Sequence, residues 1–565
     1  IAAATKVLEH RFDLLGSGPV KVSYDNLNLK FEEFQYRTQL NQARTFCALD
    51  NYEPIDWHCD FKSGLRWDGN LVYSKVRKTS DGQPGVDIKL PWELSRFQHL
   101  TVLLKAYELS KDEKYIQEVL YQIGDWIYNN RPFHGVNWTC TMDVAIRLAN
   151  WSFAMSFIQE NFTVDPSFLR MYNRSFRNHV LYIMTNLEWT KRLTSNHYLS
   201  DISGLYVSLV MRGRKSIFRA WAKSRLEKEI LKQTYNDGMN FEASTSYHRL
   251  ALELFSLPVL LSPVEFSSSY LKMLKKMYSL SFWITRRDGS IPVIGDNDSG
   301  IFFKTSLAYK VNHHYLVELW EQVFPKIEIP SFKKGFKLFP IAGLFIFRNQ
   351  QSHLVIANMP NGQNGNGGHS HNDKLSIDLW HKGQPFIVDP GTFVYTPFPN
   401  ERNRYRKTSY HNTIAVSKLE QNDLSVGLFK MNRKAIEQKN SFRELDNGDI
   451  EFEGSHDYFS TLDSKIIHTR TVNITSSKVI LNDSVSSSSE DIVYSEAVLL
   501  IPKEIIKEVN GNNIATSIGK LEASCSEWKE GKSIRRASSY GELEQELIQF
   551  KIEFDSLLTV TIYFE

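Results

Sequence analysis

The chain lacks three features that would each indicate a particular class of protein. Its four cysteines, Cys47, Cys59, Cys140 and Cys525, are scattered without metal-type spacing, so the sequence does not predict a zinc module built from cysteines. No apolar run approaches the length needed to cross a bilayer, so we expect no membrane span. The formal net charge is only +3 and no basic tail is present, so we expect no nucleic-acid partner.

The length of the chain indicates more than one domain. At 565 residues it exceeds what one ordinary hydrophobic core supports. The sequence starts at Ile1 and not at methionine, so a removed signal peptide would leave no trace in it. We expect a periplasmic or secreted protein, with a cytoplasmic location as the alternative.

The first 330 or so residues have the apolar periodicity of helices, separated by short breaks of Gly, Pro, Asn and Asp. Many sequential helices with short turns and no clean repeat period favour a closed α/α toroid over a regular solenoid. The predicted helices cover Leu100–Ser110, Lys114–Asn129, Met142–Glu160, Ser175–Thr190, Gly204–Arg212, Arg214–Gln233, Ser244–Leu261 and Tyr270–Arg286.

From about residue 340 the pattern changes to strands joined by Asn-, Gly- and Ser-rich connections, which indicates an antiparallel β-sandwich. We therefore predict a multidomain α and β protein with an α/α toroid domain over 1–335 and a β-sandwich domain over 336–565. The predicted strands cover Leu344–Arg348, His353–Asn358, Leu375–His381, Thr413–Ser417, Ile466–Val472, Val479–Val485, Ala497–Ile501 and Leu557–Phe564.

Three short segments of the β half carry the residue types of a metal site. His371, Asp389 and His411 would supply two imidazoles and a carboxylate, which suit zinc or a similar divalent ion. His369 lies two residues before His371, and in a strand these two side chains share a face. Chance His-x-His pairs and an ordinary Asp-Pro-Gly turn are the alternative. Because all three segments occur within about forty residues, we favour a metal site with a catalytic histidine beside it.

The helical half carries further polar clusters. Asn196 and His197 precede a predicted helix, and helix capping is the alternative explanation for this segment. Tyr247 and His248 lie in the first turn of another helix, where an interfacial tyrosine is the alternative. The loop that contains Asp296 has two aspartates at i and i+2, but it lacks the rest of a calcium-loop pattern, which favours a simple turn.

Aromatic and basic residues suggest where a sugar polymer would bind. Trp92 and Trp138 are candidates for stacking on sugar rings, with core packing as the equally weighted alternative. Arg404 belongs to a local basic cluster, Arg402–Lys407, that permits an anionic ligand, although charge runs are usually solvated surface.

Together, these segments resemble the heparinase II/III-like polysaccharide lyases. In the β half the resemblance rests on His369-x-His371-x-Asp373, on Val388 to Thr392, and on Arg404 to Thr413. In the helical half it rests on Asn196-His197, on Tyr247-His248, and on Pro91 to Phe97 ahead of Ala145 to Trp151. Order and spacing fit along most of the chain.

The resemblance implies an incomplete α/α toroid followed by an antiparallel β-sandwich, with the active site between them. It implies β-elimination on an anionic, uronic-acid-containing polysaccharide, with glycosaminoglycans the favoured substrates. By matching motif, Tyr247 is the expected acid/base, His369 its partner, and Asn196 and His197 the groups that neutralise the substrate carboxylate. The further residues expected to bind substrate are Trp92, Arg96, Trp138, Asn150, His248 and Arg404.

The resemblance gives His371, Asp389 and His411 the role of ligands to one structural divalent ion. Zinc is the first choice, with manganese and calcium as alternatives. Which of Tyr247 and His369 is the base stays open at this point, because substrate stereochemistry would decide it.

Two other functional classes compete with the lyase. The first is a glycoside hydrolase on an α/α toroid that uses paired carboxylates such as Glu242 and Asp296. The second is a non-catalytic polysaccharide-binding protein, for which changing Tyr247 would alter nothing. A metal-dependent hydrolase, in which the ion activates water, is a weaker third alternative.

Overall fold

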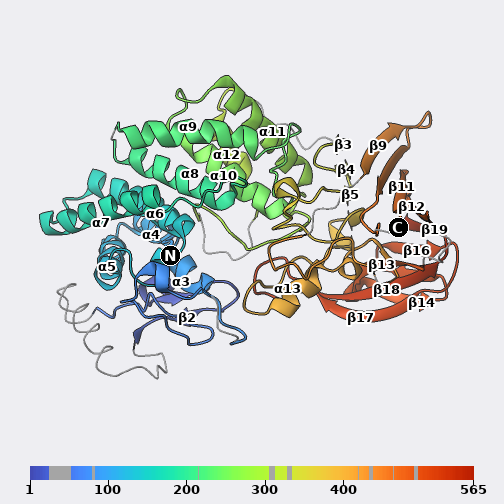
Figure 1. Ribbon diagram of the computed structural model, residues 1–565, viewed down its shortest axis with the longest axis horizontal. Helices are drawn as coiled ribbons and strands as arrows, with labels where there is room; N and C mark the ends of the chain where they lie inside the picture. The colour runs from blue at the N-terminus through green and yellow to red at the C-terminus, as the bar shows by residue number, and fades with distance from the viewer. Residues whose placement is uncertain are drawn as a thin grey trace.

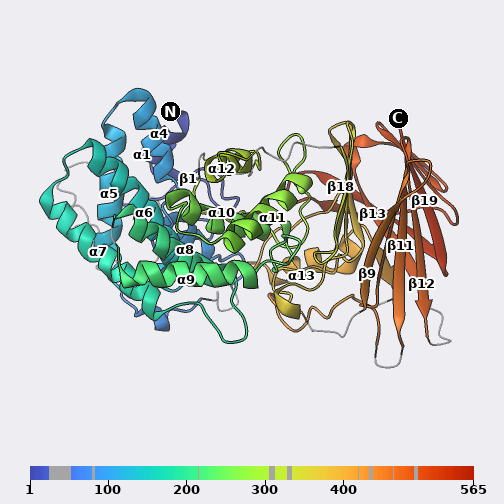
Figure 2. The same cartoon turned by 90° about the horizontal axis from the view of Figure 1, so that it is seen from above.

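The computed structural model shows a helical N-terminal half followed by a β-sheet half (Figure 1; Figure 2). It describes residues 1–24, 52–78, 83–213, 215–304, 312–327, 334–417, 419–431, 437–461, 464–488 and 494–565. Cys47 lies outside these ranges. No helix within them is both long and apolar enough to cross a membrane.

The helical half is built from helices that pack on their neighbours along the chain around one apolar core. A short hairpin of β1 (Arg11–Phe12) and β2 (Val20–Lys21) lies near its start. The helices are α1 (Ala2–Leu8), α3 (Lys89–Ser95), α4 (Leu100–Ser110), α5 (Lys114–Asn129), α6 (Thr141–Asn161), α7 (Pro166–Thr185), α8 (Asn196–Met211), α9 (Ile217–Lys232), α10 (Thr245–Leu261), α11 (Ser268–Ile284) and α12 (Tyr315–Val323).

Helix α8 lies at the centre of this half, in contact with α6, α9 and α10. Its Gly204 faces Ala145 of α6, where an added Cβ would lie 2.6 Å from the Ala145 carbonyl oxygen, so only glycine permits this approach. The prediction began this helix at Gly204, but the structure begins it at Asn196. The extra turns carry Asn196 and His197, which therefore belong to the helix itself.

The β half contains three antiparallel sheets. The five-stranded sheet has the order β3 (Gly335–Phe339), β4 (Leu344–Arg348), β5 (Ser352–Ala357), β6 (Ser376–His381), β7 (Gln384–Ile387). The four-stranded sheet has the order β17 (Lys529–Arg535), β18 (Glu546–Phe554), β13 (Ser495–Pro502), β8 (Ile414–Val416). The eight-stranded sheet has the order β14 (Ile506–Asn510), β15 (Asn513–Thr516), β16 (Gly519–Ala523), β19 (Leu557–Phe564), β12 (Lys478–Ser487), β11 (Ile466–Ile474), β10 (Ile450–His456), β9 (Gln438–Glu444).

One apolar cluster joins the inner faces of the three sheets into a sandwich. Every second residue of β11 is buried, and the residues between them are partly exposed. This alternation is typical of a strand with one face on the core and the other in water. The short helix α13 (Pro399–Arg406) follows β7 and lies beside the helical half (Figure 2).

The five-stranded sheet is buried on both of its faces. In β5, Leu354 and Ile356 pack into the sandwich core, whereas Val355 and Ala357 pack against the helical half. The helical side of this second cluster includes Met239 and Ile294, among other residues. The sheet therefore forms the joint between the two halves.

These features confirm the predicted fold class, a helical toroid-type half followed by an antiparallel β-sandwich. All eight predicted helices and all eight predicted strands are present, with shifted ends at several of them. Helix α12 ends at Val323 and β3 begins at Gly335, with 328–333 outside the described residues. The domain limits 1–335 and 336–565 stay a prediction.

Candidate active site

The candidate site forms where the first turns of α8 and α10 meet loops of the β half. Tyr247 lies in the first turn of α10, and the Ser244 side chain caps this helix by accepting from the Tyr247 N–H at 3.2 Å. The Ser244 hydroxyl also donates to the Asp296 carbonyl at 2.6 Å. The helix cap thus fixes Tyr247 and the loop that contains Asp296 relative to each other.

The Tyr247 ring stacks on the His369 imidazole, with ring centroids 3.7 Å apart and planes 17° apart. The Tyr247 hydroxyl lies 3.3 Å from the Tyr395 hydroxyl. Burial raises the pKa of Tyr247 well above its ordinary value of 10.0, and the neighbouring Asp298 and Tyr395 act in the same direction. Tyr247 is therefore a neutral phenol at neutral pH, and it is a proton donor in that state.

Asp296 is the centre of the polar network behind this pair. Its two carboxylate oxygens each accept one bond at 2.6 Å from the Arg402 guanidinium. They also contact His369 Nδ1 and His371 Nε2, each at 2.9 Å. Burial alone would raise the pKa of Asp296, but Arg402 and these hydrogen bonds hold it well below its usual range.

The ionised Asp296 decides which nitrogen of His369 carries a proton. A carboxylate only accepts hydrogen bonds, so His369 Nδ1 must donate. In the neutral imidazole, Nε2 then has a free lone pair. A carboxylate that holds one ring nitrogen protonated in this way leaves the other nitrogen to act as a general base.

Asn196 is held next to His369 through Glu242. The buried Glu242 carboxylate accepts from the Asn196 backbone N–H at 2.7 Å and from its Nδ2 at 2.8 Å. The second oxygen of Glu242 also lies 3.6 Å from His369 Nε2. Asn196, Tyr247 and His369, which are far apart in sequence, are therefore gathered at one place, as the sequence analysis predicted.

Two glycines allow the loops of this site to lie close together. A Cβ at Gly362 would lie 2.5 Å from the Glu242 carbonyl, and Gly295 has a φ of 68° with an added Cβ 2.7 Å from the His369 carbonyl oxygen. The Asp296 backbone N–H donates to the same His369 carbonyl at 2.9 Å. Larger residues at these positions would push the carboxylates away from their partners.

His197 makes a different set of contacts. Its Nδ1 lies 3.1 Å from the Glu188 carboxylate and 3.9 Å from the Cys140 sulfur. Desolvation lowers the pKa of His197, but the Glu188 charge outweighs this and raises it to about 9. His197 is therefore an imidazolium at neutral pH, and its side chain is 42% exposed.

The predicted metal residues are arranged as a pair of histidines, each oriented by a carboxylate. His371 Nε2 bonds Asp296, and His411 Nδ1 bonds Asp389 at 2.7 Å, so His371 Nδ1 and His411 Nε2 keep lone pairs. Both of these atoms are buried without a hydrogen-bond partner. The ring centroids lie 5.3 Å apart. The donor chemistry fits a divalent cation, because metal-binding histidines usually donate their other N–H to a carboxylate.

Asp389 contacts His411 in this structure, and its role as a ligand stays a prediction. One of its oxygens accepts from His411 and the other from the Gly391 N–H at 2.9 Å, so in this structure Asp389 orients His411. The neighbouring Asp373 has a buried oxygen without a partner. The spacing in the sequence identified Asp389 but could not distinguish a ligand from a residue that supports one.

Four of the residues predicted to bind substrate are structural instead. Each of these side chains is buried, which leaves no face for a sugar. Arg96 pairs with Asp143 and Glu93, Trp138 packs against His179 in the helical core, Asn150 donates to the Ile146 carbonyl, and His248 bonds the Met277 carbonyl and Ser281. Trp92 is half-buried with its N–H on the Val136 carbonyl, and Arg404 is exposed beside Glu401.

The sequence analysis missed the role of Asp296, which it interpreted as part of a turn, and it gave no role to Tyr395. It counted Arg402 in the surface basic cluster, but Arg402 is fully buried on Asp296 with its guanidinium 4.4 Å from the Tyr395 ring centre. No local pattern could show the contact of Arg402 with Asp296, because these residues are 106 positions apart in the sequence. The Gly-bounded Asp-Asn-Asp run was the one available signal.

Comparison with known proteins agrees with this fold. Residues 24–328 match the model "Heparinase II/III N-terminus", and residues 333–544 match "Heparinase II/III-like, C-terminal". A helical half joined to a β-sandwich, with Tyr247 and His369 between them, is the layout that the resemblance implied. The chain belongs to the heparinase II/III family.

The chain is also similar, at low sequence identity, to proteins whose names state a function. The chain is 25% identical over 382 residues to a heparin-sulfate lyase of Bacteroides stercoris, covering 59% of this chain and 55% of that protein. It is 26% identical over 364 residues to a heparin-sulfate lyase of Pedobacter heparinus, covering 59% of this chain and 53% of that protein. The matched regions thus span about half the length of these relatives. A solved heparinase III structure superposes with a TM-score of 0.65 at 20% identity, covering 100% of this chain and 88% of that chain, which shows the shared fold.

Proposed function

We propose that the protein is a polysaccharide lyase that cleaves uronic-acid-containing polysaccharides by β-elimination. The observation that carries this proposal is the Tyr247 ring stacked on a His369 whose tautomer is fixed by Asp296. Elimination needs a base at C5 of the uronate and an acid at the oxygen on C4. The two side chains of this stack supply one of each.

In this proposal His369 is the base and Tyr247 the acid. The Nε2 lone pair of His369 takes the C5 proton, while Nδ1–H stays on the Asp296 carboxylate. The raised pKa of Tyr247 keeps its phenol protonated, so it can donate to the leaving oxygen. The reverse assignment would need a tyrosinate, and the carboxylates of Asp296 and Asp298 oppose its formation.

Asn196 and His197 serve the substrate carboxylate. Elimination builds charge onto a group that is already anionic, so neutral and cationic donors beside it stabilise the transition state by about 3 kcal/mol each. The Asn196 amide has two N–H donors and uses one on Glu242, which leaves the other for substrate. The raised pKa of His197 keeps this neighbour of Asn196 protonated, so an imidazolium is also available to the substrate carboxylate.

The contacts of Glu242 and Asp296 oppose the glycoside hydrolase. A hydrolase needs one carboxyl group that stays protonated and can reach the leaving oxygen. Asp296 is held ionised by Arg402, and Glu242 is fully buried and accepts two bonds from Asn196. Both carboxylates thus serve to orient other residues.

A divalent cation, with zinc the first choice and manganese or calcium the alternatives, completes the proposal. His371 Nδ1 and His411 Nε2 would hold it, supported by Asp296 and Asp389. When bound, such an ion would fix the segment that contains His369 by tying His371 to His411. Its role in this proposal is structural, and no proton transfer depends on it.

The substrate class that we propose is the glycosaminoglycans, acted on in the periplasm or outside the cell. The names of the curated relatives and the imidazolium of His197 support an anionic uronan. The test is to incubate the protein with hyaluronan, chondroitin sulfate, dermatan sulfate, heparan sulfate, heparin and alginate, and to follow the ultraviolet absorbance of unsaturated uronate ends.

The outcomes of this panel separate the competing functions. A rise in absorbance on one polymer that Tyr247→Phe abolishes would support the lyase and identify its substrate. New reducing ends without a rise in absorbance would support the hydrolase instead. Binding without either product would support a polysaccharide-binding protein and overturn the proposal.

A further inference from the structure

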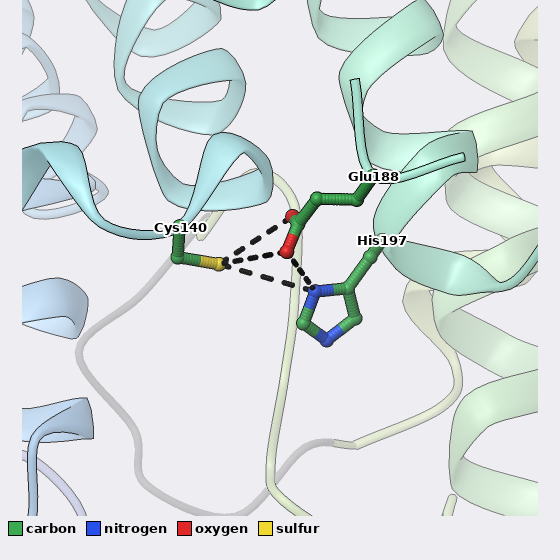
Figure 3. A group of neighbouring side chains, drawn as sticks. All are labelled: Cys140, Glu188 and His197. Atoms are coloured by element: carbon green, nitrogen blue, oxygen red, sulfur yellow. Dashed lines mark hydrogen bonds and ion pairs between the residues drawn. The ribbon is translucent and has the colours of Figure 1, made fainter. Parts of the chain in front are cut away.

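A second cluster of metal-ligating side chains lies in the helical half, outside the His371–His411 pair. Cys140 precedes α6, Glu188 lies between α7 and α8, and His197 is in the first turn of α8. Figure 3 shows the three side chains pointing toward one another from these three segments. Within the described part of the chain, no other three such side chains place all their donor atoms within 4.8 Å of one another.

The distances in this cluster are close to those around a tetrahedral metal ion. The Cys140 sulfur lies 3.6 Å from Glu188 Oε2, 4.0 Å from Glu188 Oε1 and 3.9 Å from His197 Nδ1, and Nδ1 lies 3.1 Å from Oε1. Ligands at zinc distances of about 2.0–2.3 Å are about 3.3–3.6 Å apart in a tetrahedron. The three donor atoms therefore already approximate one face of a coordination shell.

The surroundings of the cluster are acidic and accessible from one side. The carboxylates of Asp143 and Asp201 lie near enough to His197 to raise its pKa together with Glu188. Asp143 and Asp201 each keep a buried oxygen with no hydrogen-bond partner. Cys140 is buried, but the side chains of His197 and Glu188 are 42% and 27% exposed, so a cation could enter from their side.

Helix capping accounts for only part of this arrangement. One Glu188 oxygen accepts from the Met142 N–H at 2.9 Å, which satisfies the start of α6. This contact explains why a carboxylate lies here. It does not explain why a thiol and an imidazole converge on the same carboxylate at ligand distances.

We propose that Cys140, Glu188 and His197 form a second cation site, selective for a thiolate-binding divalent ion such as Zn²⁺. The sulfur, one Glu188 oxygen and His197 Nδ1 are three ligands, and the fourth position faces solvent. Binding replaces the thiol proton of Cys140 and the Nδ1 proton of His197, and both protons pass to solvent. In the loaded site the ion therefore supplies the positive charge that the His197 imidazolium supplies in the metal-free protein, and His197 keeps its Nε2–H as a donor. The site differs from the His371–His411 pair by its sulfur ligand, which hard cations such as calcium avoid.

The test uses Co²⁺ as a spectroscopic substitute for Zn²⁺, because only a thiolate ligand gives an intense sulfur-to-cobalt charge-transfer band. The whole chain, kept reduced with a thiol-free reductant, is titrated with Co²⁺ and then with Zn²⁺. We expect a charge-transfer band that saturates at one equivalent and is displaced by Zn²⁺. The His371–His411 pair has no sulfur and cannot produce this band.

Cys140→Ser should remove the band. It should also weaken Co²⁺ binding at this site by about 10-fold or more, because loss of a residue that merely hydrogen-bonds to a metal ligand already costs about 10-fold. Cys525→Ser is the matched control, since it removes another free thiol and should keep the band. Glu188→Gln keeps the thiol and should keep the band at weaker affinity, which covers the case in which Cys140→Ser does not fold.

Three results would overturn this second site. They are no band in the wild-type protein, a band that survives in a folded Cys140→Ser variant, and a band lost equally in Cys525→Ser. The measurement needs no substrate, so its outcome is independent of whether the protein is a lyase.

Discussion

The two halves of the molecule hold their site residues by different means. Tyr247 and Asn196 lie in first turns of helices. The Ser244 cap and the helix backbone define the position of Tyr247, and Glu242 holds Asn196 at the start of α8. His369 and His371 lie in a loop and depend on Asp296, which is more than seventy residues away in sequence. We therefore expect substitutions in these helix turns to change chemistry alone, and substitutions in the Asp296 network that joins the two halves to change chemistry and stability together.

The largest effect on activity is expected for Tyr247→Phe. Loss of the phenol removes the acid and should lower kcat by about 10²–10⁴-fold. The hydroxyl has one protein partner, Tyr395, so the free energy of unfolding should change by only about 1 kcal/mol. Tyr278→Phe is the control, because its hydroxyl bonds Ser256 inside the helical core, and it should keep its activity. Equal losses in the two variants would contradict the comparison.

Asp296→Asn should damage both chemistry and stability. The amide no longer dictates the tautomer of His369, which should lower kcat by about 10²-fold. The buried Arg402 loses its counter-charge, which should cost about 3–5 kcal/mol of unfolding free energy. Asp483→Asn is the control, since Asp483 pairs with the buried Arg470 and with His468 inside the β-sandwich and does not contact His369, so it should lose stability but keep activity. Thermal unfolding and initial rates measure the two effects, and an Asp296→Asn variant of normal stability would break the comparison.

Removal of the proposed structural cation should lower stability and activity less than the Asp296→Asn substitution does. A chelator should lower the melting temperature and the activity together. If the ion normally exceeds its dissociation constant 100-fold, its removal should cost about 2.7 kcal/mol of unfolding free energy. The experiment is best done in Cys140→Ser, so that only the His371–His411 pair contributes. His411→Ala should no longer respond to the chelator. A metal-free protein with full activity and an unchanged melting temperature would refute the structural role of the ion.

The smallest effect is expected on the alkaline side of the pH profile. If Tyr247 is the acid, the protein is active below the pKa of Tyr247, and that pKa lies well above 10.0. Tyr247 should therefore cause no loss of kcat/KM between neutral pH and pH 10, and a fall near pH 9 is expected from His197 alone, which loses its imidazolium proton there. A steady rise in kcat/KM over the same range would instead assign Tyr247 as the base, because a base must first lose its proton.

Sequence patterns predicted the helices and strands in which apolar residues recur with a clear period. The helix over Lys114–Asn129 and the strand over Leu344–Arg348 were predicted with the ends that the structure shows. Exposed strands were missed: β9 (Gln438–Glu444) is polar on both faces and has no alternation to detect. The start of α8 was missed because its first turns are rich in Ser, Asn and His, which have weak helix propensity.

The candidate site was predictable where a motif carries the chemistry, and unpredictable where a distant partner does. His369, Tyr247 and Asn196 were identified by their motifs, and the structure gathers them. The network of Asp296, Arg402 and Glu242 depends on contacts between segments, so no spacing reveals it. The failed substrate residues share one cause: a tryptophan or an arginine in a helix can face the core as easily as a cleft, and Trp138 and Arg96 face the core.

The five-stranded sheet has a consequence for attempts to divide the chain. Val355 and Ala357 on one face of β5 are covered by the helical half, and Leu354 and Ile356 on the other by the sandwich. A fragment that begins at β3 would expose the first pair, together with the rest of that apolar face, to water. We expect such a fragment to aggregate on expression, and a protease that cuts between α12 and β3 to leave two pieces that stay associated.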